Sequence, residues 1–213
     1  MEYTNSIFRV DTRHDQINNS VLECINGRAV DLAYAFGIHA LPSDLKLCIH
    51  LCEYEQFIEL ADKFGISKQY NECLAFCYDA IYAIEYTYID ATQIEDDYCK
   101  IILHECIHLL QHISTGLMPI KAIWLYESIA CYLADQKMNI PACLPSWQSF
   151  HSDFYSIKDN YAIAYLFGKE LIDNIGLERI IEIQDNLKEL HAIGYRVYKE
   201  LQNKSILNHH QTL

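Results

Sequence analysis

The sequence has few of the residues that interrupt regular secondary structure. Only 7 glycines and 4 prolines occur among its 213 residues, where average usage gives about 25 of the two together. This scarcity argues against a β-sandwich, a collagen and a low-complexity linker protein. It predicts long helices joined by few turns.

Basic residues and long apolar runs are also scarce. The chain has 16 Lys and Arg against 29 Asp and Glu, a formal net charge of −13. Because this charge repels phosphates and anionic lipids, we expect neither nucleic acid nor a membrane as partner. No apolar run approaches the roughly 20 residues that span a bilayer, and the start MEYTNSIFRVDTRHD lacks the apolar region of a signal peptide. We therefore expect a cytoplasmic protein.

The chain has nine cysteines, an odd number. Without a signal peptide, this count favours reduced thiols over a disulfide framework. The pairs Cys48/Cys52 and Cys73/Cys77 lack the Cys-x2-Cys spacing of zinc ribbons, and we interpret them as structural. With 51% hydrophobic residues, a chain of this length can bury a full core, and we expect one domain over residues 1–213.

Hydrophobic periodicity divides the chain into three parts. Residues 1–40 form an N-terminal helical segment, with an amphipathic helix from Asp15 to Phe36 that stops near Gly37. Residues 41–92 combine period-two and aromatic-rich stretches, which predict a small mixed β-sheet with strands at 45–51 and within 73–89, and one helix at 55–64. Residues 93–205 read as helix throughout, at 93–115, 120–136, 157–174, 177–190 and 195–202. We therefore predict an α+β fold, with a frayed tail near residues 208–211.

One pentapeptide carries a recognisable chemistry. His104-Glu105-Cys106-Ile107-His108 is an H-E-x-x-H sequence inside the predicted helix 93–115. Four residues advance a helix by about 400°, so the two imidazoles lie one turn apart on the same face and can share a metal ion. Glu105 is adjacent to the first ligand and can act as general base toward a water on that metal. We place Cys106 on the opposite, core-facing side.

A catalytic zinc usually has a third protein ligand. A metzincin would supply it from H-E-x-x-H-x-x-G-x-x-H, but Gln111 stands in place of the glycine and Ser114 in place of the last histidine. Glu127 lies on the next predicted helix, 19 positions after His108. Because a turn containing Gly116 and Pro119 lets the two helices face each other, we predict Glu127 as the third ligand.

Both halves of this pattern resemble the gluzincins. Their signature joins H-E-x-x-H to a Glu within a W-L-x-E-G/S-x-A helix, and this chain has Trp124-Leu125-Tyr126-Glu127-Ser128-Ile129-Ala130. The chain most resembles the compact minigluzincin-like peptidases. The resemblance implies a zincin-like fold, one Zn²⁺ per chain bound by His104, His108 and Glu127, and Glu105 as general base. It also implies an edge strand, residues 83–88 here, that aligns the substrate.

A second match follows the third ligand. Residues 160–166, NYAIAYL, resemble the family's Y-x-x-G/A-x-x-F/L helix, which implies that Tyr161 hydrogen-bonds the developing oxyanion. Two departures accompany it. Cys131 stands where thermolysin-like members have an acid, and the G-x-M-x-N segment of aminopeptidases is absent. We read His112 as a helix-surface residue or a supporting neighbour of the metal, and His151 as a surface residue or a helper of Tyr161.

We therefore expect a zinc-dependent peptidase that acts on a peptide or protein substrate through a metal-activated water. The alternative is a binding or regulatory module in which the zincin scaffold is catalytically inactive or latent.

Overall fold

The structure is a computed structural model. It describes residues 8–11, 23, 27–28, 31–38, 47–63, 75–78, 84–88, 95–115, 122–139, 141 and 143–211. The chain divides into two compact units, Met1–Ile113 and Ser114–Leu213. Within the described ranges, no helix combines the length and the apolar character that crossing a membrane requires.

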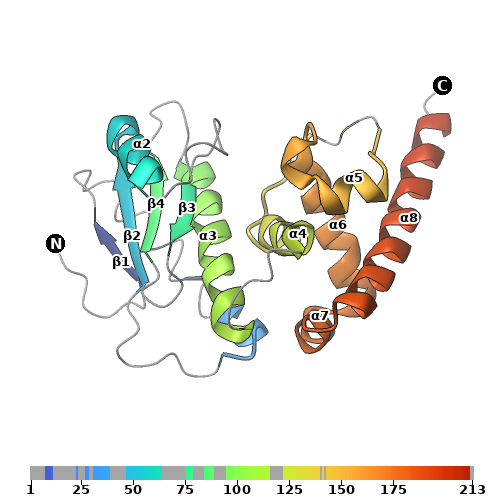
Figure 1. Ribbon diagram of the computed structural model, residues 1–213, viewed down its shortest axis with the longest axis horizontal. Coiled ribbons are helices and arrows are strands. Elements are labelled where there is room, and N and C mark those ends of the chain that lie inside the picture. Colours follow the sequence, from blue (N-terminus) through green and yellow to red (C-terminus); the bar gives the residue numbers. More distant parts are fainter. Residues whose placement is uncertain are drawn as a thin grey trace. The chain divides into compact units, whose positions relative to one another are not determined.

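The described residues of the first unit include four short strands in the order β1-β2-β4-β3 (Figure 1). The strands are β1 (Phe8–Asp11), β2 (Leu47–Cys52), β3 (Ala75–Tyr78) and β4 (Ile84–Tyr88). β2 runs parallel to both β1 and β4, whereas β3 and β4 are antiparallel. β4 pairs with a strand on each side, so Ile84–Tyr88, the described part of the predicted strand 83–88, is not the edge strand that the family resemblance implies.

Two helices of this unit follow the periodicity of the sequence. In α2 (Tyr54–Lys63), Phe57 and Ala61 lie four residues apart and are both buried. α3 (Glu95–Thr115) matches the predicted helix 93–115, and Gly116 with Pro119 follows its end. Of the predicted helix 15–36, residues 23, 27–28 and 31–35 are described and helical, and Gly37 follows with φ of +72°.

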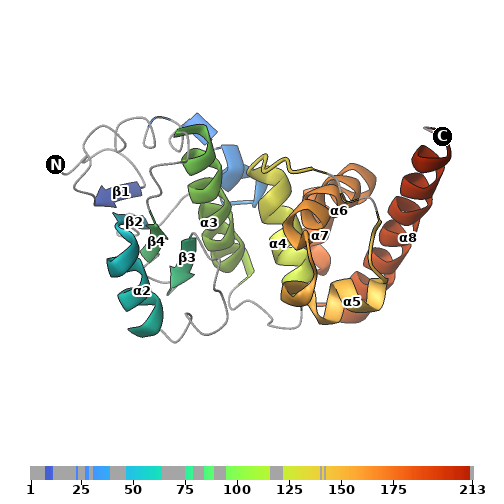
Figure 2. The ribbon, with the colours of Figure 1, turned by 90° about the horizontal axis from the view of Figure 1, so that it is seen from above.

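The second unit is helical (Figures 1 and 2). α6 packs against both α4 and α8, and its core is rich in aromatic rings from Trp124, Phe150, Phe167 and Tyr198. Ser146 caps α5 through its side chain, which accepts a hydrogen bond from the backbone N–H of Ser149. The elements are α4 (Ile123–Leu133), α5 (Trp147–Ser152), the 3₁₀ turn η2 (Phe154–Ser156), α6 (Asn160–Ile175), α7 (Leu177–Ile183) and α8 (Leu187–Gln211).

A single glycine joins α6 to α7. Gly176 has φ of 78° and ψ of 148°, and it ends one helix while it begins the next. Its backbone N–H donates to Ile172, and its carbonyl accepts from Ile180. Beyond α7 the predictions are wrong in two respects. The break between the last two helices lies at residues 184–186, between Ile183 and Leu187, and not at 191–194 as predicted, and α8 extends through the predicted frayed tail to Gln211.

The predicted α+β fold class is wrong, because the described part of the chain is predominantly helical. Each strand has only four to six residues, whereas α3 has 21 and α8 has 25. The physical reason is that stretches rich in β-branched and aromatic residues favour strands locally but do not set how much of the chain the strands occupy. The scarcity of glycine and proline, which permits long helices, indicates the helical character of the chain more accurately than the strand-like stretches do. The predicted single domain over 1–213 stays a prediction.

Candidate metal centre

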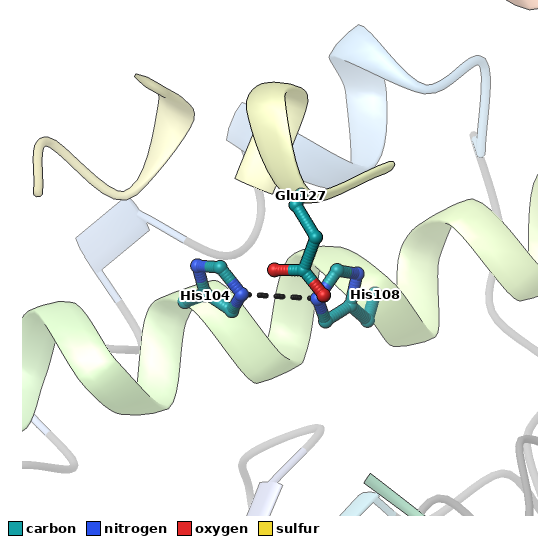
Figure 3. A group of neighbouring side chains, drawn as sticks. All are labelled: His104, His108 and Glu127. Atoms are coloured by element: carbon teal, nitrogen blue, oxygen red, sulfur yellow. Dashed lines mark hydrogen bonds between the residues drawn. The ribbon is translucent and has the colours of Figure 1, made fainter. Parts of the chain in front are cut away.

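His104 and His108 converge on one point beside α3 (Figure 3). Both side chains are buried, with exposed fractions of 5% and 8%. Their Nε2 atoms lie 3.0 Å apart, and the two rings are nearly perpendicular at 85°. The helical spacing of four residues therefore brings two nitrogen donors together, as the sequence predicts.

Gln111 orients the second histidine. Its Oε1 lies 2.8 Å from Nδ1 of His108, one helical turn away, and Gln111 is itself buried. An amide oxygen only accepts, so this contact requires the proton on Nδ1. His108 then presents the lone pair of Nε2, the atom that points toward His104. Sequence reasoning used Gln111 only to exclude a metzincin and missed this contact.

Glu127 is held on the most buried helix of the second unit. The side chains from Trp124 to Cys131 are all buried, and Glu127 has an exposed fraction of 8%. Its Oε1 accepts a hydrogen bond of 2.8 Å from the Tyr155 hydroxyl. A carboxylate has about four lone-pair positions, so this bond leaves it able to bind a metal as well.

His104, His108 and Glu127 form a buried group that can hold a metal ion (Figure 3), as predicted. One ligand atom from each residue lies within 4.8 Å of the others. Two nitrogens on a tetrahedral zinc, at bonds of about 2.05 Å, are about 3.3 Å apart, close to the 3.0 Å between the two Nε2 atoms. Two imidazoles with one carboxylate are also a donor set of catalytic zinc. The residues therefore fit the ion.

The two predicted catalytic residues lie on different helices, Glu105 on α3 and Tyr161 on α6. Glu105 is buried, with an exposed fraction of 8%, and it follows the first ligand on α3. Cys106 is fully buried, which confirms its place in the core. Tyr161 lies in the first turn of α6, where its ring packs edge-on against Phe154 at 5.9 Å. The catalytic roles of Glu105 and Tyr161 stay predictions.

His112 and His151, the two other histidines considered from the sequence, have different surroundings. His112 is half-buried, and burial, followed by the charge of His108, lowers its pKa. His151 stacks on Trp147 with ring centroids 5.3 Å apart, and it meets His191 edge-on at 4.9 Å. Burial and then the charge of His151 lower the pKa of His191. His151 therefore belongs to an aromatic cluster of the second unit. The sequence predicted a surface residue or a helper of Tyr161 and did not predict this cluster.

A hollow of about 580 Å³ lies beside that cluster in the second unit. Its lining includes His151, His191 and Tyr155. Tyr155, whose hydroxyl donates to Glu127, therefore forms part of its wall. The sequence motifs give Tyr155 no role in the site. Twenty-eight residues separate Tyr155 from Glu127, and no periodic signal reports a contact at that separation.

Loss of the Gln111 amide is expected to weaken metal binding. Gln111→Leu removes the acceptor that fixes the tautomer of His108, so we expect about 10-fold weaker zinc affinity, at the lower end of such effects. Competition with a chromophoric chelator measures this. Gln148→Leu is the matched control, because Gln148 donates to Ser152 at an exposed site. Equal affinities for the two variants would contradict the role of Gln111.

Comparisons with family models, curated proteins and solved structures return no match to this chain.

Proposed function

We propose that this protein is a zinc-dependent peptidase. The observation that carries the proposal is the buried group of His104, His108 and Glu127, whose ligand atoms lie within 4.8 Å of one another. Glu105 follows His104 directly, which completes the H-E-x-x-H pattern of metallopeptidases. The resemblance of both sequence motifs to the gluzincins supports the same reaction.

The ligand residues have distinct tasks in this proposal. His104 and His108 supply neutral nitrogen donors, and Glu127 supplies an anionic oxygen donor. Gln111 holds His108 in the tautomer that leaves Nε2 unprotonated. When bound, zinc supplies Lewis acidity, which lowers the pKa of a water and polarises a carbonyl.

Proton transfer is assigned to Glu105. Its carboxylate takes the proton from the attacking water and delivers it to the leaving amine, as a general base and then a general acid. Tyr161 donates a hydrogen bond to the oxygen that gains negative charge, the role implied by the family resemblance. The substrate is a peptide or a protein.

Metal content and cleavage together test the proposal. We expect close to one zinc per wild-type chain by mass spectrometry, on tag-free protein purified without chelator or added zinc. Glu127→Gln removes the anionic ligand, and its zinc content is expected to fall markedly. A peptide library incubated with the wild-type protein should show cleavage that a chelator abolishes and zinc restores.

The possible results separate three cases. Zinc with chelator-sensitive cleavage supports the peptidase. Zinc without cleavage of any library peptide contradicts the proposed reaction and favours the latent or regulatory scaffold. If zinc is absent even after it is supplied, the metal site itself is contradicted.

A further inference from the structure

Tyr155 contacts a predicted metal ligand from outside that ligand's helix. It lies in the 3₁₀ turn η2, and its hydroxyl donates a 2.8 Å hydrogen bond to Oε1 of Glu127 on α4. Both residues belong to the second unit, so this contact is a property of that unit by itself.

The turn that carries Tyr155 is anchored by its neighbour. Phe154 has an exposed fraction of 4%, and its ring meets Phe150 at 5.8 Å and Tyr161 at 5.9 Å. The backbone N–H of Ser156 also donates to the carbonyl of Asp153 at 2.8 Å. A rigid turn lowers the entropy cost of holding the Tyr155 hydroxyl at one position.

The burial of Glu127 makes a hydrogen-bond donor important. A buried carboxylate is costly unless donors or a cation compensate for lost water. In thermolysin-like gluzincins an acid stands four residues after this ligand, but here that position is Cys131, which is fully buried. Tyr155 reaches the carboxylate from a different element and compensates part of this cost.

We propose that Tyr155 is a positioning residue, whose hydroxyl orients the Glu127 carboxylate for metal binding. The inference rests on the proposed zinc site. Tyr155 acts on the ion through Glu127, because its hydroxyl donates a hydrogen bond to that carboxylate. Outer-shell partners of this kind typically change metal affinity by about 10–100-fold.

The primary test compares zinc affinities by chelator competition. Tyr155→Phe removes one oxygen and keeps the ring, so we expect a Kd about 10–100-fold weaker than that of the wild type. Tyr195→Phe is the matched control, because Tyr195 is an exposed tyrosine on α8 of the same unit. Its Kd is expected to equal that of the wild type.

Two further readouts separate positioning from a general loss of structure. In Co²⁺-loaded protein, Tyr155→Phe should shift the visible absorption bands, because Glu127 changes its orientation. In a double-mutant cycle, Tyr155→Phe should weaken Co²⁺ and Zn²⁺ binding no further when Glu127→Gln is already present. A fully additive loss would overturn the inference, as would an unchanged Kd with an unchanged Co²⁺ spectrum.

Failure of the inference is distinguishable from failure of the proposed function. A wild-type protein that binds no zinc contradicts both the metal site and the role of Tyr155. If the wild-type protein binds zinc, and Tyr155→Phe has the same Kd and the same Co²⁺ spectrum as the wild type, only the role of Tyr155 is contradicted.

Discussion

Glu105→Gln is expected to lower kcat/KM for peptide hydrolysis by about 10²–10⁴-fold, because glutamine cannot accept the proton of the attacking water. Zinc content should stay at the wild-type level, since His104, His108 and Glu127 are unchanged. Initial rates on a peptide that the wild-type protein cleaves, together with metal analysis of the same samples, measure both quantities.

An exposed glutamate provides the control for this experiment. Glu200 lies on α8 and is exposed, so Glu200→Gln makes the same chemical change outside the proposed site and should leave kcat/KM unaltered. Wild-type turnover by Glu105→Gln would refute the assignment of the general base. A loss of zinc in that variant would instead indicate a structural role for Glu105.

Gly168→Ala is expected to destabilise the second unit by about 3 kcal/mol, at the upper end of typical overpacking effects. A Cβ at this position would lie 2.0 Å from the backbone oxygen of Ser128 and 2.7 Å from its carbonyl carbon. Because both atoms are backbone, α4 and α6 would have to separate. Ser128 follows Glu127, so zinc affinity should fall as well. Thermal unfolding should show a midpoint lower by about 10 °C.

The matched control makes the same substitution where space is open. Gly27 is helical, and a Cβ there would meet no atom within 4 Å. Gly27→Ala should therefore stabilise the protein by about 0.5–1 kcal/mol, through the higher helix propensity of alanine. The two substitutions are expected to change the free energy of unfolding in opposite directions. A Gly168→Ala midpoint at or above the wild-type value would contradict the close approach of α4 and α6.

Local signals were sufficient to predict the ligand group. The apolar spacing and the following Gly116 predicted α3 to within two residues at its start, and helical geometry then placed His104 beside His108. Glu127 followed from its position 19 residues after His108 beyond a turn, with the family motif in support, and the structure brings the three residues into one buried group. The identity of the metal and the reaction stay predictions, because the arrangement of the side chains specifies neither which ion binds nor which substrate is cleaved.

Longer-range features were not predictable in this way. β1 pairs with β2 across a separation of 39 residues at Phe8 and Leu47, and such pairing has no periodic signature within either strand. β4 was expected at an edge by analogy but has partners on both sides. The fold class was wrong because short strand-like segments reveal neither their final length nor their share of the structure.

The turn at Gly176 limits which sequences can encode the second unit. Its φ of 78° and ψ of 148° fall where residues with a side chain are almost never found. One position must therefore stay achiral for α6 to end and α7 to start without an intervening loop. In a library of random variants selected for folding, codon 176 should show almost no diversity, although no side chain there contacts the predicted metal site. The position would then be invariant for a reason of backbone geometry, and its invariance would carry no information about catalysis.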